Sequence, residues 1–471
     1  MLFTVDIGTT NFKAAVFDFD GNCLFLTEVP LINKTGSIFE FDSSQWLKSF
    51  EDCCARAGNL SGIEAIVICG NGPTLVPVTA EHEKVLDGFA HNARLWLDRR
   101  AVKYQEEVSE AAGGFVDSCF FLPKVLKIKN EEYELYKSVK HFIGCPEYLA
   151  YALTGKACTV FPSEGFDRWF WNDAVLKKLN LDAEKFPPFI NAGDQFGTIT
   201  PSAAVKYGFK KNIPVISGGP DFFTAILGAG VTEPSTGCGR TGSSEGINIC
   251  TLNRVNDRRL MSYSHPVKPF WNLSGVINTT GKAVQWGCSF LGIESYEDFF
   301  SLAKKSQKGS GGLVFLPYLA GERAPVWDSQ LRGLWKGLSL SSEKSGAANS
   351  ILEGICFAVR DVLETMEETG ERVKHLRLTG KMAANAYLNQ MKADISGKEI
   401  IEVKQKEAEL LGLAVIGSCY LGKYKSYKEA SNKMVKIDNH YEPDVKNADV
   451  YNQLFNEYKE SRNFYHGSKL T

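Results

Sequence analysis

Residues 6–13 (DIGTTNFK) combine a carboxylate, hydroxyls, an amide, turn amides and a cation in a short segment. A carboxylate such as Asp6 suits a hydrated divalent cation, while hydroxyls and turn amides suit phosphate oxygens. The candidate phosphate contacts here are Thr9, Thr10, Asn11 and Lys13. The alternative is a hairpin corner whose Asp and Thr side chains satisfy only local backbone donors.

A second loop of similar composition covers residues 239–244, with the sequence GRTGSS. Two such loops, each beside a strand and in separate halves of the chain, suit a nucleotide held in a cleft between two domains. The candidate phosphate contacts in this loop are Thr241, Gly242 and Ser243.

Asp221 follows Gly218-Gly219-Pro220 at the apparent start of a helix. One interpretation is an N-cap or first-turn acid, which is a common structural role. The other is a general base near the seam between the two halves of the chain, where a positioned carboxylate accepts a proton.

Two segments of the N-terminal half, residues 70–74 and 94–100, carry amide, carboxylate, guanidinium and indole groups. Sugars are bound by such polar groups with an aromatic face nearby. Equally, Trp96 could be a core residue and the arginines the exposed start of a helix.

The elements that must position these residues alternate between strands and helices, which indicates an α/β fold. The opening residues predict an antiparallel meander over 2–5, 12–19 and 23–29, with Asp20-Gly21 as a hairpin turn. Further predicted helices cover 43–57 and 96–112, and further predicted strands cover 63–69, 213–217 and 247–251. A similar plan restarts after Gly230, so we predict lobes at 1–230 and 231–471, the second ending in a helical segment with Tyr and Phe anchors.

Composition excludes several classes of protein. The 471 residues carry 53 Lys and Arg against 55 Asp and Glu, so no global field would draw the chain to nucleic acid or to an anionic membrane. The 12 cysteines form no CxxC pair, which argues against a zinc ribbon or a disulfide framework. With no long uncharged apolar run, we expect a soluble, cytoplasmic protein.

Residues 318–333 read YLAGERAPVWDSQLRG, a block that closely resembles a characteristic motif of the FGGY carbohydrate kinases. Looser resemblances to that family follow in the same order along the chain. They lie at residues 6–10, 40–42, 96–101, 146–155, 218–221, 378–380, 389–394 and 407–414.

The resemblance implies two actin-like, ribonuclease-H-like lobes with an interdomain cleft, sugar bound mainly by the first lobe and ATP mainly by the second. It implies transfer of the γ-phosphoryl group of ATP to a sugar hydroxyl, with Asp221 as catalytic base and Mg²⁺ near Asp6 and Asp221. The implied sugar contacts are Asn71, Gly72, Trp96, Asp98 and Asp221. The implied adenosine-side contacts are Gly380, Lys381 and Asn385, and the segment 407–414 resembles the same side of the site.

Three departures from the family pattern concern the nucleotide contacts, in the first two cases, and the substrate, in the third. In the family, the second phosphate loop usually reads GTSG. The adenosine loop usually has consecutive glycines, where this chain has Gly380-Lys381-Met382. Xylulokinases carry a Met-His pair in the loop that corresponds to residues 70–74 of this chain. We expect a pentulose such as xylulose. Gluconate, ribulose or glycerol, a sugar-indifferent ATP hydrolase and a non-catalytic sensor are the alternatives. A homodimer is left open as the assembly.

Overall fold

The computed structural model describes residues 1–89 and 91–467, which form two compact units, each built on its own sheet. Unit 1 comprises Met1–Gly228 and Glu409–Met434, and unit 2 comprises Ala229–Ala408 and Val435–Thr471. The lobes predicted from the sequence are two continuous halves of the chain, whereas unit 1 also includes residues 409–434. Within the described residues, no helix is long and apolar enough to cross a membrane.

The sheet of unit 1 has six strands, in the order β11-β12-β5-β1-β2-β3. Its strands are β1 (Leu2–Ile7), β2 (Asn11–Phe17), β3 (Cys23–Pro30), β5 (Ala65–Gly70), β11 (Gln195–Thr198) and β12 (Pro214–Pro220). The antiparallel meander of β1, β2 and β3 confirms the prediction, whereas β5 runs parallel to β1 and β12 parallel to β5. β1 and β5 are buried along their whole length, as their nearly continuous apolar sequences require.

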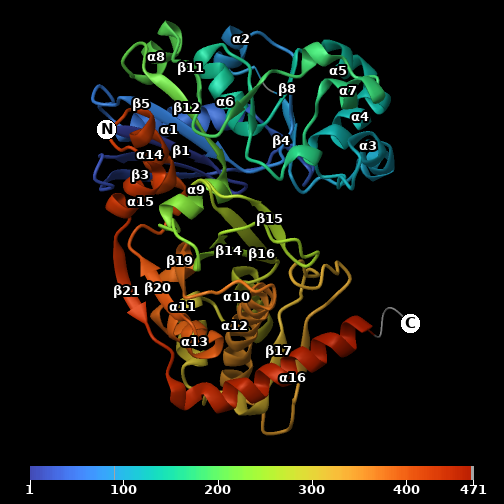
Figure 1. The fold of residues 1–471 in the computed structure, drawn as a ribbon, viewed down its shortest axis with the longest axis vertical. Coiled ribbons are helices and arrows are strands. Elements are labelled where there is room, and N and C mark those ends of the chain that lie inside the picture. Colours follow the sequence, from blue (N-terminus) through green and yellow to red (C-terminus); the bar gives the residue numbers. More distant parts are fainter. Residues whose placement is uncertain (90, 468–471) are drawn as a thin grey trace. The chain divides into compact units, whose positions relative to one another are not determined.

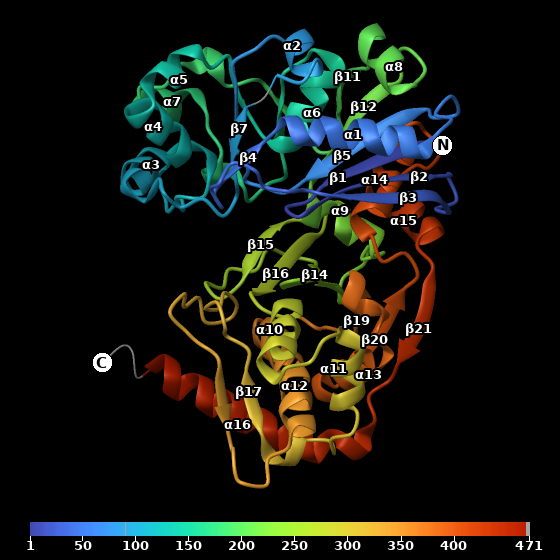
Figure 2. The same ribbon diagram turned by 180° about the vertical axis from the view of Figure 1, so that it is seen from behind.

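Helices cover both faces of this sheet (Figures 1 and 2). Phe3 of β1 packs edge-on against Phe50 of α1 (Ser44–Ala57). Its neighbour Leu2 points to the other face, where Gly417 of α14 (Ala408–Tyr420) approaches so closely that a Cβ there would lie 3.0 Å from the Leu2 side chain. The two-residue period of a strand therefore places α1 and α14 on opposite faces. The remaining covering helices are α6 (Cys145–Thr154), α8 (Pro201–Tyr207) and α9 (Asp221–Gly228).

A group of short helices gathers at one end of unit 1 around a separate apolar core (Figure 1). Its members are α3 (Gln105–Ala112), α4 (Phe121–Glu131), α5 (Tyr133–Ser138) and α7 (Asp173–Lys178). The predicted helix over 96–112 is wrong in its first half. Strand β7 (Asn92–Arg94) is followed by turns, in which Asp98 Oδ1 accepts the N–H of Arg100 at 3.0 Å, and the next α-helix begins only at residue 105.

The sheet of unit 2 has seven strands, in the order β15-β16-β14-β13-β19-β20-β21. They are β13 (Thr236–Thr241), β14 (Glu245–Thr251), β15 (Met261–Ser264), β16 (Trp271–Ile277), β19 (His375–Thr379), β20 (Glu399–Val403) and β21 (Ile437–Tyr441). The first half of the loop predicted over 239–244 is therefore strand, and residues 242–244 form the turn. β13 lies between antiparallel β14 and parallel β19, just as β1 lies between antiparallel β2 and parallel β5. The sheet plan is thus duplicated, as the sequence suggested.

The core of unit 2 surrounds α12 (Lys344–Glu368), a long and mostly buried helix. It packs with α10 (Gly281–Leu291), α11 (Tyr296–Ala303) and α13 (Ala386–Ser396). The terminal helix α16 (Ala448–Gly467) is seen in Figure 2. Its residues Tyr451, Phe455 and Tyr458 are all buried, which confirms the predicted aromatic anchors.

Candidate active site

Asp6 lies near the end of β1 in unit 1 and is 5% exposed. The Cys69 thiol on neighbouring β5 donates to Asp6 Oδ1 at 3.5 Å. Burial, together with the negative charges of Glu409 and Asp221, raises the pKa of Asp6 to about 8 against the opposing positive charge of Lys13. Three carboxylates and one lysine therefore share the environment at this end of β1.

This concentration of carboxylates suits a cation. Among the residues that the structure describes, no three His, Cys, Asp or Glu side chains are grouped as direct ligands of a metal ion. Mg²⁺, however, usually keeps several of its waters and is held by one or two carboxylates together with phosphate oxygens. The donor set around Asp6 and Asp221 fits an ion bound in this way.

Asp221 is the first residue of α9 and directly follows β12. Its Oδ1 accepts the N–H of Phe222 at 2.6 Å, and its carbonyl accepts the hydroxyl of Thr224 at 2.9 Å. Gly219 has φ 78°, a conformation that favours glycine, and a Cβ on Gly218 would lie 2.1 Å from Leu413 of α14. The two glycines thus let the chain turn sharply and deliver Asp221 to the same region as Asp6.

Asn71 and Gly72 follow β5, at the same edge of the sheet. The backbone and side-chain N–H groups of Asn71 donate to the carbonyl of Ile7 at 2.9 and 2.8 Å, and the Cys145 thiol donates to the Asn71 carbonyl at 3.1 Å. Asn71 therefore ties the ends of β1 and β5 together. A direct contact of Asn71 or Gly72 with a sugar stays a prediction.

The indole Nε1 of half-buried Trp96 donates to the hydroxyl of exposed Thr9 at 2.9 Å. Asp98 is 2% exposed, and both of its oxygens accept from the Arg100 guanidinium, at 2.9 and 2.8 Å. Although burial would raise it, the pKa of Asp98 is held below its usual value by these bonds. The Asp98 carboxylate is thus buried and paired with Arg100, whose own side chain is partly exposed. A role of Asp98 in sugar binding stays a prediction.

A row of aromatic rings leads to Asp221, and the sequence patterns did not single it out. Phe222 stacks on Phe166 with ring centroids 5.9 Å apart, Phe166 meets Trp169 edge-on at 5.1 Å, and Trp169 stacks on Phe120 at 5.2 Å. The only available signal was the density of aromatic residues over 161–171, which carries no polar pattern that would mark a site.

In unit 2, the turn after Thr241 packs against the segment that follows β19. The Thr241 hydroxyl donates to the Thr379 carbonyl at 2.6 Å, and a Cβ on Gly380 would lie 2.3 Å from the Thr241 carbonyl. Asn385 caps α13, since its side chain accepts the N–H of Leu388 at 3.0 Å. The structure therefore brings together Thr241 and Gly380, two of the predicted nucleotide contacts, while Lys381 lies in the short 3₁₀ helix between Gly380 and Asn385.

Sequence reasoning missed the start of α10, which closes over the same turn. The N–H of Gly281 donates to the Gly242 carbonyl at 3.0 Å, and the N–H groups of Thr280 and Lys282 donate to the Ser243 carbonyl at 3.1 and 3.2 Å. The signal available was the glycine and threonine run 279–281 after an apolar strand.

A buried ion pair lies next to the turn at residues 242–244. Lys392 of α13 donates to both oxygens of Glu245 at 2.6 and 2.8 Å, and each side chain is 1% exposed. It joins the first residue of β14 to the helix capped by Asn385.

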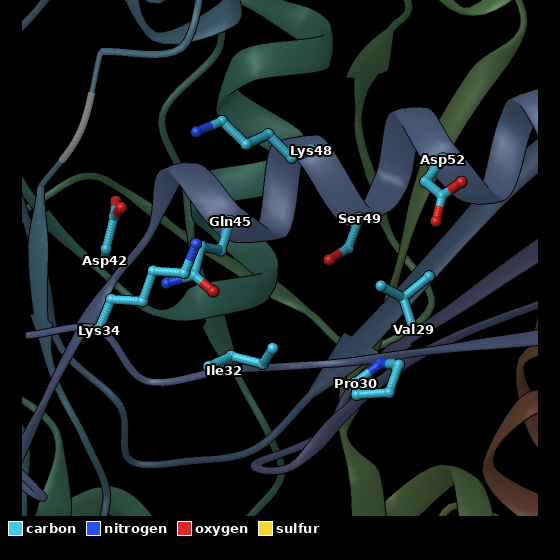
Figure 3. Close-up of a pocket in the computed structure, with 9 residues that line it drawn as sticks. All are labelled: Val29, Pro30, Ile32, Lys34, Asp42, Gln45, Lys48, Ser49 and Asp52. Atoms are coloured by element: carbon cyan, nitrogen blue, oxygen red, sulfur yellow. The ribbon is translucent and has the colours of Figure 1, made fainter.

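A shallow cavity of about 380 Å³ lies on another part of unit 1 (Figure 3). Gln45, Lys48, Ser49 and Asp52 of α1 face the end of β3 and the segment after it, together with Asp42. None of the predicted site residues lines this cavity, so it has no part in the site built above.

The N-terminal domain of the FGGY family of carbohydrate kinases matches residues 1–228 and the C-terminal domain of that family matches residues 241–420, so the chain belongs to this family. The protein is therefore a phosphotransferase with the two-domain, actin-like, ribonuclease-H-like fold predicted above.

Among individual relatives, a xylulose kinase of Staphylococcus epidermidis is 30% identical, with 97% of this chain and 95% of the relative covered. A gluconokinase of Bacillus subtilis is 25% identical, with 96% and 93% covered. The solved structure of a ligand-bound xylulose kinase from Lactobacillus acidophilus superposes with a TM-score of 0.85 at 22% identity, over 98% of each chain.

Proposed function

We propose that this protein is an ATP-dependent xylulose kinase. The observation that carries the proposal is that Asp6 and Asp221, at the ends of β1 and β12, lie close enough for their charges to interact. The chain also has a xylulose kinase relative that it matches over nearly its full length. The alternative substrate is gluconate, favoured by a second relative of similar coverage and by Gly72-Pro73 within the segment where xylulokinases carry Met-His.

Asp221 is the proposed base. Its carboxylate takes the proton of the acceptor hydroxyl as the hydroxyl oxygen bonds to the γ-phosphorus of ATP, and the bond from that phosphorus to the bridging oxygen of ADP breaks. Because this chemistry demands mainly alignment and charge compensation, the N–H groups and hydroxyls of the two turns matter most. Residues Thr9, Thr10, Asn11 and Lys13 in unit 1 and Thr241, Gly242 and Ser243 in unit 2 are the proposed phosphate contacts.

Asp6 and Asp221 would hold Mg²⁺ through its waters, and when bound that ion offsets the negative charge that gathers on the phosphate oxygens. The acceptor contacts proposed in unit 1 are Asn71, Gly72, Trp96 and Asp98, and the adenosine contacts in unit 2 are Gly380, Lys381 and Asn385. A cytoplasmic location and a homodimer complete the proposal.

The test is a coupled assay of ADP release with D-xylulose, D-ribulose, gluconate and glycerol in turn. We expect the highest kcat/KM with D-xylulose. A higher value with gluconate would transfer the proposal to that acid. ADP release indifferent to every acceptor would indicate a hydrolase, and ligand binding without turnover would indicate a sensor.

A further inference from the structure

Lys124, on α4 of unit 1, is a buried lysine whose ammonium group donates hydrogen bonds to main-chain oxygens. It is 2% exposed, and its Nζ donates to the carbonyls of Pro73 and Leu95 at 2.8 and 2.7 Å, with the Arg94 carbonyl at 3.4 Å. These carbonyls belong to the two segments that carry Asn71 and Trp96. One side chain from a third segment therefore joins both.

The need for this lysine follows from the local backbone. Leu75 and Arg94 exchange N–H to carbonyl bonds of 2.9 and 2.7 Å, which pair the two segments for one step. The pairing stops two residues earlier in the chain because Pro73 has no N–H to donate. A buried carbonyl without a donor is unfavourable, and an ammonium group has three donors for the three carbonyls around it. The carbonyls of Arg94 and Leu95 also accept the N–H groups of Leu75 and Asp98, so the Pro73 carbonyl depends most on Lys124.

The positive charge of Lys124 is buried, which is unfavourable. Burial outweighs the opposing negative charges of Asp98 and Asp117 and lowers the pKa of Lys124 to about 7. A buried lysine is costly unless it is well paired, and an apolar residue would fill a helix face at lower cost. Its placement between two segments predicted to bind the acceptor sugar gives it a use beyond packing.

We propose that Lys124 is a positioning residue for the acceptor site, which holds the turn 70–74 at a fixed distance from the segment 94–100. The proposal rests on the proposed kinase function. Loss of the ammonium group removes its bonds to the three carbonyls, of which Arg94 keeps the N–H of Leu75 and Leu95 keeps the N–H of Asp98. The two segments then lose the side chain that joins them and can move apart, so the acceptor is bound less well. The nucleotide contacts proposed in unit 2 belong to the other compact unit, so we expect them to change little.

The experiment compares Lys124→Met, Lys124→Gln and the matched control Lys185→Met. Lys185 is also a buried lysine of unit 1, 8% exposed, and its Nζ donates to the Val139 carbonyl at 2.7 Å, far along the chain from either segment. Kinetics are measured with ATP and whichever of D-xylulose, D-ribulose, gluconate and glycerol the wild type uses best. Amide hydrogen exchange is measured on the free proteins.

For Lys124→Met we expect KM for the acceptor to rise about tenfold or more, with KM for ATP within about twofold. Lys124→Gln, which retains two donors, should show a smaller rise. Exchange should quicken in peptides over 71–76 and 92–98 in both variants. Lys185→Met should lower Tm but leave acceptor KM and exchange in those peptides unchanged.

A folded Lys124→Gln with wild-type acceptor KM and wild-type exchange would overturn the proposal, as would equal effects of Lys185→Met. If the wild type phosphorylates none of the four acceptors, the proposed function fails. The exchange comparison still decides whether Lys124 holds the two segments, because it needs no substrate.

Discussion

The indole N–H of Trp96 bonds to the hydroxyl of Thr9 at 2.9 Å across 87 positions of sequence. This bond ties the segment that carries the proposed sugar contacts to the loop that carries the proposed phosphate contacts, within a single unit. Binding of the sugar or of the phosphates to one segment is therefore expected to affect the geometry of the other segment.

Trp96→Phe keeps an aromatic ring without the N–H, and Thr9→Val keeps the shape without the hydroxyl. Each is expected to raise acceptor KM and to lower kcat, and the double variant should cost less than the sum of the two, with a coupling of about 0.5–3 kcal/mol in kcat/KM. The control is Trp335→Phe in unit 2, which breaks an equal 2.9 Å bond to Ser350. Strict additivity at Trp96 and Thr9 would show that the bond has no catalytic consequence.

Asp6 should make stability depend on pH. Its pKa rises from an ordinary value of 3.8 to about 8 on folding, so the folded state holds the extra proton between those values. The free energy of unfolding is therefore expected to fall as pH rises through this window, by up to about 1.4 kcal/mol per pH unit for one proton. Asp6→Asn removes this contribution.

Urea denaturation at pH 5, 6, 7 and 8 without Mg²⁺ should thus show a shallower fall for Asp6→Asn than for the wild type. Asp18→Asn is the matched control: burial acts to raise the pKa of Asp18, but its hydrogen bonds with Asn22 and neighbouring amides bring it below the ordinary value. That variant should keep the wild-type slope above pH 5. Parallel curves for Asp6→Asn and wild type would refute a raised pKa.

The buried pair of Glu245 and Lys392 should govern ATP binding through the turn in front of it. Glu245→Gln leaves Lys392 charged and without its carboxylate, which we expect to cost roughly 3–5 kcal/mol of stability and to raise KM for ATP while leaving acceptor KM unchanged. Asp52→Asn breaks an exposed pair with Arg56 of 2.7 Å and should cost only about 0–1 kcal/mol. Thermal unfolding with steady-state kinetics checks both, and equal costs would contradict the account.

Asp221→Asn is expected to lower kcat by about 10²–10⁴, the usual contribution of a positioned general base. Stability should hardly change, because an amide oxygen still accepts the N–H of Phe222. Asp173→Asn, at the exposed first turn of α7, should leave kcat unchanged. A near-normal kcat in Asp221→Asn, or unfolding of that variant, would favour a helix-start role alone.

Local patterns were enough to predict the parts of the fold that depend on neighbours in sequence. The meander of unit 1 follows from alternating strands joined at Asp20-Gly21, where Gly21 has φ 82°. Asp6 and Asp221 could be singled out because each stands where a strand ends. The start of the helix predicted at residue 96 failed because the Asp98 side chain bonds to the Arg100 backbone and favours a turn.

Long-range packing could not be predicted in this way. The charge of Glu409 acts on Asp6 only because α14 packs with unit 1. This packing requires glycine at residue 412, where a Cβ would lie 1.8 Å from the Thr224 carbonyl. The segment 407–414 resembled the adenosine side of the site, yet Glu409 onward packs with unit 1. Lys124 and the Glu245–Lys392 pair likewise carry no sequence signal, since their partners lie 29 to 147 positions away.

Transfer of a phosphoryl group from ATP to a sugar is followed most directly with γ-³²P-labelled ATP, D-xylulose and Mg²⁺. We expect one labelled sugar phosphate per ADP released, little inorganic phosphate, and loss of transfer in Asp221→Asn. Label recovered as inorganic phosphate at a rate that D-xylulose, D-ribulose, gluconate and glycerol all leave unchanged would contradict this expectation.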